Sequence, residues 1–119
     1  IFSHGGGTMP SLVERFGIGG PDNVSDNLAR PAEPNSRLYH LRRFYYDTAQ
    51  STNPVKMTGL KMIVGTSQIL FGSDHIDPVS PGIERHLQGL QKCGLTAAEI
   101  AAIHRGNAER LFPRLKGTA

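Results

Sequence analysis

Three residues that can bind a metal ion or exchange a proton, His4, Asp47 and Asp74, each follow a short apolar run. The runs read IFS, FYY and ILFGS, and their β-branched and aromatic residues favour strands. In parallel architectures, ligands and catalytic groups gather at the carboxyl ends of the strands. The three residues therefore predict one site, at a single edge of a sheet, for metal or acid–base chemistry.

Asp74 follows the most apolar of these runs. Because side chains alternate along a strand, Leu70 and Asp74 share one face. If Leu70 points into a barrel, Asp74 points into its mouth, where a carboxylate needs a cation or strong hydrogen-bond donors. A metal ion would satisfy that need. The alternative is a structural carboxylate that caps the following loop.

His4 precedes three consecutive glycines, which allow close backbone approach or unusual dihedral angles. Imidazole is a common zinc ligand, so His4 is a candidate metal ligand. The alternative is a core histidine that precedes a flexible turn. Asp47 is expected to organise the turn after its strand rather than to act in catalysis.

Strands that alternate with helices favour βα units and a parallel sheet. The continuous apolar run 69–71 is typical of a strand buried on both faces. Expected strands cover 1–4, 44–49 and 68–72, expected helices cover 9–16, 36–42, 54–64, 82–92 and 96–112, and a long loop covers 17–34.

Polar residues at the helix ends predict specific caps. Thr8 and Asn35 are expected N-caps, and Thr96 with Glu99 has the spacing of a capping box. Asn107 is expected to bond backbone groups where the last helix packs on the sheet.

The chain has 119 residues, which fits one domain over 1–119. Its net charge is +3 and its basic residues are dispersed, so no nucleic-acid partner is expected. The single cysteine, Cys93, fits a reducing compartment, and no run reaches the roughly 20 apolar residues of a membrane span. A cytoplasmic protein with no membrane partner is expected. Because Ile1 already lies in an expected strand, we interpret the start of the chain as a fragment boundary.

Four motifs occur in an order that resembles the amidohydrolase superfamily. The resemblance is to strands five to eight and the closing helix of amidohydrolase-related proteins, in the branch with aminocarboxymuconate-semialdehyde decarboxylase and aromatic-acid decarboxylases. It implies an α/β fold, the C-terminal half of a TIM (β/α)8 barrel. The motifs are HGGGTMP at 4–10, FYYDTA at 44–49, ILFGSD at 69–74 and GNAERLF at 106–112.

The resemblance also implies a divalent metal, with zinc expected, at the mouth of the barrel. The residue that matches His4 is a metal ligand in that branch, and the residue that matches Asp74 is a ligand or an acid–base group. Such a metal polarises the substrate and lowers the pKa of bound water. The implied reaction is hydrolysis or nonoxidative decarboxylation of a small carboxylic acid, ester or lactone.

Three departures from the family pattern bear on the reaction. No His-x-His pair, which supplies two further ligands in the family, occurs in this sequence. The segment 47–51 reads DTAQS and lacks the acid–base histidine of the decarboxylases, which favours hydrolysis slightly. His75 stands where the family has tyrosine, and with Asp74 it is a candidate catalytic residue; the alternative is a polar loop residue.

Two other function classes remain open. The chain could be a noncatalytic half-barrel that forms a homo-oligomer or pairs with a missing N-terminal half, because an open half-barrel exposes sheet edges and apolar surface. It could instead be a degenerate binding protein without metal. The other candidate groups are expected to be inert: His40 and His86 as helical surface residues, His104 as a residue of the last helix away from the strand ends, and Cys93 as a thiol without a catalytic partner.

Overall fold

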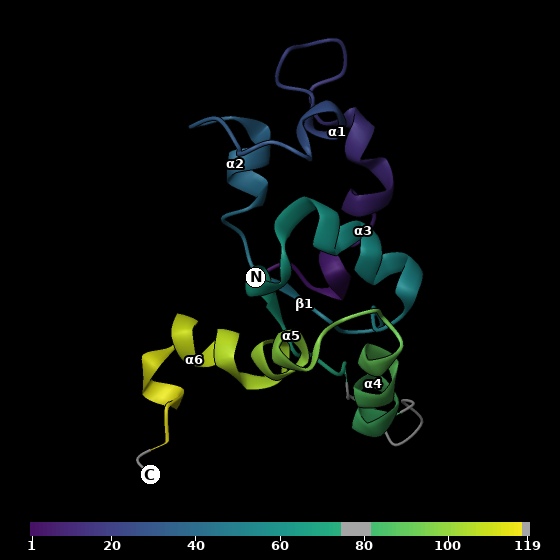
Figure 1. Cartoon of the computed structure of the whole chain (residues 1–119), viewed down its shortest axis with the longest axis vertical. Coiled ribbons are helices and arrows are strands. Elements are labelled where there is room, and N and C mark those ends of the chain that lie inside the picture. Colours follow the sequence, from purple (N-terminus) through teal and green to yellow (C-terminus); the bar gives the residue numbers. More distant parts are fainter. Residues whose placement is uncertain (75–81, 118–119) are drawn as a thin grey trace.

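The computed structural model describes residues 1–74 and 82–117. Figure 1 shows α1 and α2 toward one end of an elongated molecule, α3 and β1 in the middle, and α4, α5 and α6 toward the other end. None of the helices in these ranges has the length and apolar content to cross a membrane. The elements are α1 (Val24–Asn27), α2 (Arg37–Leu41), β1 (Tyr46–Asp47), α3 (Pro54–Val64), β2 (Ile69–Leu70), α4 (Gly82–Gln91), α5 (Ala97–Ala101) and α6 (Asn107–Leu111).

The predicted parallel sheet is present, with shorter strands than expected. In the register of β1 and β2, Tyr46 pairs with Ile69 and Asp47 with Leu70. Phe2 forms a single parallel bridge to Tyr46 on the other side of β1. The expected strand 1–4 is therefore reduced to this bridge, because the backbone of His4 turns into the left-handed region (φ 55°).

The core lies where α3 and the two strands meet. Ile69 and Leu70 are both buried, as the continuous apolar run predicts for a strand covered on both faces. Burial of apolar area on this scale is the main force that holds the helices on the sheet. The cluster comprises Val24, Leu38, Tyr46, Met57, Leu60, Ile63, Val64, Ile69, Leu90, Cys93 and Ile103.

Helix caps confirm some predictions and correct others. The predicted capping box of Thr96 and Glu99 is complete. Asn53, for which no cap was predicted, accepts a hydrogen bond from the backbone of α3. Ser36, not Asn35, caps α2: its backbone is extended, so its hydroxyl oxygen reaches the amide of Tyr39.

The N-terminal third contains two further differences from the prediction. Residues 9–15 form a 3-10 helix rather than an α-helix, and Thr8 makes no side-chain cap. The expected loop 17–34 contains the single helical turn α1, which begins at the cap Asn23. Asn23 is buried and its amide donates to the carbonyl of Glu14, so a tertiary contact secures this turn.

The predicted helix 96–112 is interrupted by a π-helical segment between α5 and α6, at Ala102–Gly106. Phe71, the residue after β2, donates its backbone N–H to the carbonyl of Ile103 within that segment (2.9 Å). Wider π-type turns alter the backbone pairing inside a helix. The interruption therefore accompanies a direct bond between the last helical region and the end of β2.

We expect acid to weaken the contact between α3 and α5. Lys61 Nζ lies 2.8 Å from a carboxylate oxygen of Glu99. Hydrogen bonds from Lys61 and Thr96 lower the pKa of Glu99 from its usual 4.5 to about 2. A lowered folded-state pKa gives a stabilisation that is present above pH 4.5 and is lost as the pH falls toward 2.

Urea denaturation between pH 6 and 2 tests this expectation, with Glu99→Gln as the comparison. The stability difference between the original chain and Glu99→Gln should shrink as the pH falls through that window. A difference that stays constant with pH would contradict an ionised contact. Because the pair is partly exposed, salt should also reduce the difference.

Candidate metal site

The ends of the parallel strands bring His4 and Asp74 together, although 69 residues separate them in the chain. His4 Nε2 lies 3.6 Å from Asp74 Oδ2. The Asp74 side chain is about one-fifth exposed and that of His4 about half exposed, so solvent reaches the pair. The two predicted metal ligands thus face each other at the edge of the sheet where they were expected.

Asp47 organises this edge, as the sequence predicted. Its Oδ1 accepts a hydrogen bond from the backbone N–H of His4 (2.8 Å) and from that of Ala49 (3.0 Å). One carboxylate therefore holds the turns after two neighbouring strands.

Thr48 extends the link between the strands beyond their short ladder. Its buried hydroxyl donates to the carbonyl of Gly72 (2.9 Å) and accepts from the N–H of the same residue (3.0 Å). Gly72 lies two residues before Asp74, so this pair of bonds sets the path of the chain into the site. A Cβ on Gly72 would come within 3.0 Å of Asp47 Cβ, which explains why a glycine fits here.

Left-handed backbone is concentrated at the site. His4, Gln50 and Asp74 have positive φ angles of 55°, 47° and 52°. Such angles are uncommon for residues other than glycine and are often found at functional sites. Gln50 Nε2 donates to Asp74 Oδ2 at 2.6 Å, so side chains of all three residues meet at one carboxylate.

The glycines after His4 have a structural reason. Gly5, Gly6 and Gly7 all have positive φ, and Gly5 is buried with Lys56 and Ser51 about 3.0 Å from where a Cβ would lie. Lys56 Nζ donates to the carbonyl of Gly7. The three glycines therefore let the chain turn tightly next to His4.

The pair fits part of a metal site. A metal ion lies about 2.0–2.2 Å from imidazole nitrogen or carboxylate oxygen, so one ion can contact two donor atoms 3.6 Å apart. Catalytic zinc normally has three protein ligands. Within residues 1–74 and 82–117, no group of three or more histidine, cysteine, aspartate or glutamate side chains could hold an ion. His75, the other candidate catalytic residue, lies outside the described residues.

His86 differs from its prediction as a surface residue: only 4% of it is exposed. Its Nδ1 lies 3.2 Å from Thr52 Oγ1, and its Nε2 is buried without a hydrogen-bond partner in the described part of the chain. The residues next to His86 in the sequence do not predict this burial, because Thr52, which contacts the ring, belongs to the loop after β1 and is distant in the chain.

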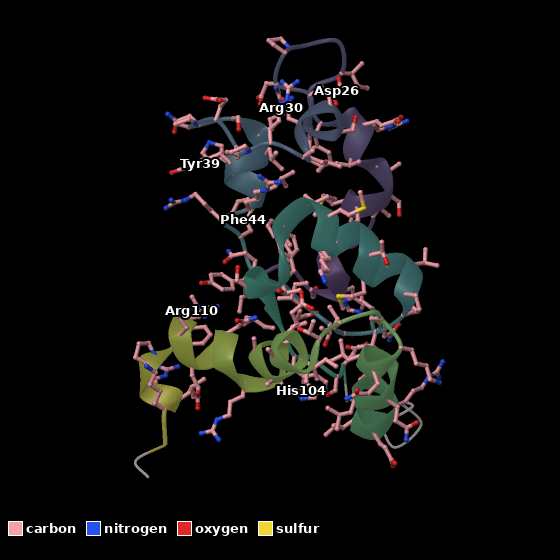
Figure 2. The ribbon with its side chains drawn as sticks, in the orientation of Figure 1. Asp26, Arg30, Tyr39, Phe44, His104 and Arg110 are labelled. Carbon is pink, nitrogen blue, oxygen red and sulfur yellow. The ribbon has the colours of Figure 1, made fainter. Side chains whose placement is uncertain are left out.

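The other candidates behave largely as expected. His40 is exposed, and burial raises the pKa of the Cys93 thiol, which suits an inert cysteine. His104 is exposed, but it packs edge-on against Phe71, just after β2, rather than away from the strand ends. Figure 2 shows His104 among the helices of the C-terminal third.

A pocket of about 520 Å³ lies beside the site, between the loop after β1 and α4. Gln50, which contacts Asp74, is part of its wall, so pocket and carboxylate are neighbours. Among the residues that the structure describes, the lining contains two cationic side chains and no carboxylate. The lining residues are Gln50, Thr52, Asn53, Pro54, Arg85, His86, Gln88, Gly89 and Lys92.

Gln50 is the residue of this site that the sequence did not single out. The departure from the family pattern at 47–51 pointed to this position, because a histidine was expected nearby and glutamine stands there. Only the fold shows that its amide reaches Asp74.

Comparison with known proteins confirms the predicted resemblance. No protein-family profile matches the chain. A 6-methylsalicylic acid decarboxylase of Penicillium expansum is 35% identical over 117 residues, which are 98% of this chain and 35% of the relative. The chain therefore spans about a third of the length of the curated decarboxylases that it matches.

Solved structures agree on the fold. A 2,6-dihydroxybenzoate decarboxylase bound to 2,6-dihydroxybenzoate superposes with a TM-score of 0.69 at 20% identity, over 94% of this chain and 33% of that protein. A dihydroxybenzoic acid decarboxylase from Polaromonas, with manganese and the inhibitor 2-nitroresorcinol, gives 0.68 at 19% identity, over 97% and 33%. The chain is thus a mixed α/β segment that covers a third of TIM-barrel decarboxylases.

Proposed function

We propose that this chain forms the C-terminal half of a metal-dependent decarboxylase that removes CO2 from a small aromatic acid. The observation that carries the proposal is the 3.6 Å approach of His4 Nε2 to Asp74 Oδ2 at the carboxyl ends of parallel strands. The order of the four motifs supports the C-terminal half, with the metal site divided between this chain and the rest of the barrel.

The relatives favour decarboxylation over the hydrolysis that the missing histidine suggested. The curated relatives are decarboxylases, two of them for 6-methylsalicylic acid. Two similar structures contain dihydroxybenzoate or nitroresorcinol, which are small aromatic rings with ortho oxygen substituents. An aromatic acid with a hydroxyl group beside the carboxylate is therefore the substrate class that we propose.

A divalent ion is the proposed cofactor. Manganese in one of the related structures supports a divalent ion but not the earlier choice of zinc. His4 and Asp74 would hold it, and both donor types are compatible with manganese as well as zinc. When bound, the ion would polarise substrate oxygens and stabilise negative charge as the carbon–carbon bond breaks.

Loss of CO2 leaves an electron pair on the ring carbon, which must take up a proton. Asp74 and His75 are the candidate donors in this chain. Gln50 occupies the part of the site where a family histidine was expected, and an amide cannot exchange a proton at neutral pH. Proton transfer is therefore assigned to Asp74 or His75, and Gln50 has no part in it.

The open sheet edge supports completion of a barrel by further strands. Ile1, Phe2 and Phe44 are 66%, 49% and 44% exposed beside that edge. The rings of Phe2 and Phe44 pack edge-on with centroids 5.0 Å apart, which makes a continuous apolar surface. Self-association of the chain through this edge is the alternative use of the same surface, and sedimentation at several concentrations distinguishes it from a monomer.

The ligand assignment predicts that His4→Ala and Asp74→Asn each weaken Mn²⁺ binding by at least about tenfold, since each removes one donor from a site already short of ligands. Paramagnetic broadening of amide NMR signals during Mn²⁺ titration measures this even when binding is weak. Signals around residues 4, 50 and 74 should broaden first.

His40→Ala is the matched control, because this imidazole is exposed on α2. It should leave the Mn²⁺ affinity unchanged. Equal affinity in the original chain, His4→Ala and Asp74→Asn would rule out these two residues as ligands.

A further inference from the structure

We propose that Gln50 is a positioning residue that orients the Asp74 carboxylate toward His4, and that α4 holds Gln50 in place. This inference rests on the proposed metal site. It assigns a role to a residue of the segment 47–51, which lacks the histidine of the decarboxylase pattern.

The contact selects one oxygen of the carboxylate. Gln50 Nε2 donates to Asp74 Oδ2 at 2.6 Å, and this is the same oxygen that faces His4 Nε2. A carboxylate oxygen has two lone-pair sites, so it can accept an N–H bond and contact a metal ion together. The amide thus restricts rotation of the carboxylate and leaves the second lone pair of Oδ2 for a metal ion.

The turn that carries Gln50 is held by local bonds. The N–H of Ala49 bonds to Asp47 Oδ1, and the N–H of Ser51 bonds to the carbonyl of Thr48 (2.9 Å). Ser51 is buried, and its hydroxyl donates to the carbonyl of Ala49. With bonds on both sides, Gln50 keeps its left-handed backbone and its side chain extends to Asp74.

Helix α4 supports the same turn from the other side. A Cβ on Gly89 would lie 2.3 Å from the carbonyl oxygen of Thr52, so the helix backbone approaches this loop more closely than any larger residue allows. Thr52 Oγ1 also lies 3.2 Å from Nδ1 of the buried His86. These contacts explain why His86, which was predicted to lie at the surface, is buried, and why a glycine occurs at position 89 of the helix.

The role is positional because the amide has no proton to transfer. Outer partners that orient a ligand commonly change metal affinity by 10- to 100-fold when they are removed. Gln50→Leu keeps the approximate size but removes the donor, so Mn²⁺ should bind about tenfold more weakly. Gln50→His restores an N–H donor and should recover most of the affinity.

The first measurement uses the metal-free chain. The side-chain amide signals of Gln50 should shift when Asp74 is changed to Asn, and the corresponding signals of Gln88 should not. Gln88 lines the same pocket but donates to Glu84 on its own helix. Unmoved Gln50 signals would overturn the contact itself, whatever the chain does with metal.

The second measurement is the Mn²⁺ titration of Gln50→Leu, Gln50→His and the control Gln88→Leu, with thermal unfolding to verify that each variant folds. Weaker binding in Gln50→Leu, with recovery in Gln50→His, supports the positioning role. Unchanged affinity in Gln50→Leu overturns that role while the metal site stands. If the original chain binds no Mn²⁺, His4 and Asp74 do not hold the ion without the rest of the barrel, and the Gln50 amide signals in the metal-free chain decide whether Gln50 orients Asp74.

Gly89→Ala tests the support from α4 without altering any polar group of the site. The added methyl must displace the loop at Thr52, so Mn²⁺ affinity should fall as in Gln50→Leu. Gly59→Ala is the matched control, because a Cβ there would meet Pro10 at an ordinary 3.5 Å. An unchanged Mn²⁺ affinity in Gly89→Ala would show that α4 does not hold Gln50 in place.

Discussion

Asn107→Ala is expected to lower the free energy of unfolding by about 3 kcal/mol, because one buried and one partly buried carbonyl group lose the amide that donates to them. Asn107 has no exposed surface. Its Nδ2 donates to the carbonyls of Thr66 (2.8 Å) and Ile69 (2.7 Å), which lie just before and within β2. Its Oδ1 accepts from Arg110, which Figure 2 labels on α6 (2.6 Å).

The same change should disturb the candidate site. Ile69 begins β2, five residues before Asp74. Loss of the two hydrogen bonds from the Asn107 amide should therefore loosen the strand that leads to the Asp74 carboxylate. A loss of about 3 kcal/mol is a large part of the roughly 5–15 kcal/mol that stabilises a typical domain. Asn107→Asp should cost still more, because it directs an acceptor at two carbonyl oxygens.

Urea denaturation of Asn107→Ala measures this effect. Gln91→Ala, which changes an exposed helical amide on α4, is the control and should alter stability by less than about 0.5 kcal/mol. A similar small change in Asn107→Ala would show that the buried amide is not needed to satisfy the carbonyls of β2.

Arg42→Ala is expected to lower the free energy of unfolding by about 2 kcal/mol, since hydrogen bonds from charged donors are worth more than neutral ones and three carbonyls lose a partner. The guanidinium donates to the carbonyl of Ile63 at the end of α3 (2.9 Å). It also donates to the carbonyls of Leu28 (2.8 Å) and Arg30 (2.9 Å) after α1. Figure 2 places Arg30 in the part of the molecule that holds α1 and α2.

Arg43→Ala is the matched control. This neighbouring arginine is exposed, and within the described residues its side chain contacts Tyr39 alone, through the tyrosine hydroxyl and ring. Its loss should therefore cost less than about 1 kcal/mol. Arg42→Lys should lower the free energy of unfolding almost as much as Arg42→Ala, because one ammonium group cannot reach the three carbonyls that the planar guanidinium contacts. If Arg42→Ala and Arg43→Ala have the same free energy of unfolding, the three hydrogen bonds from Arg42 to backbone carbonyls contribute nothing to stability.

Local patterns in the sequence determined the elements whose stabilising contacts are near in the chain. The helix 54–64 was predicted because Pro54 suits its first turn and Gly65 follows its last residue. The start of the helix after Thr96 was predicted because Thr96 and Glu99 have the spacing of a capping box. The burial of Ile69 and Leu70 followed in the same way from an unbroken apolar run.

The family motifs predicted that His4 and Asp74 lie close together, because each residue follows an expected strand and the expected strands are parallel. The role of Asp47 in its turn was likewise predictable, since an aspartate can accept from the backbone two residues later, as it does from Ala49.

Tertiary structure alone decided the features that depend on groups far apart in the chain. The burial of His86 and the need for Gly89 arise where α4 meets a loop more than 30 residues away. The short first strand, the π-helical turn at Ile103 and the contact of Gln50 with Asp74 are set by the same kind of long-range packing. Side-chain type and spacing specify which bonds a residue can make, whereas the packed fold determines which partners come within reach.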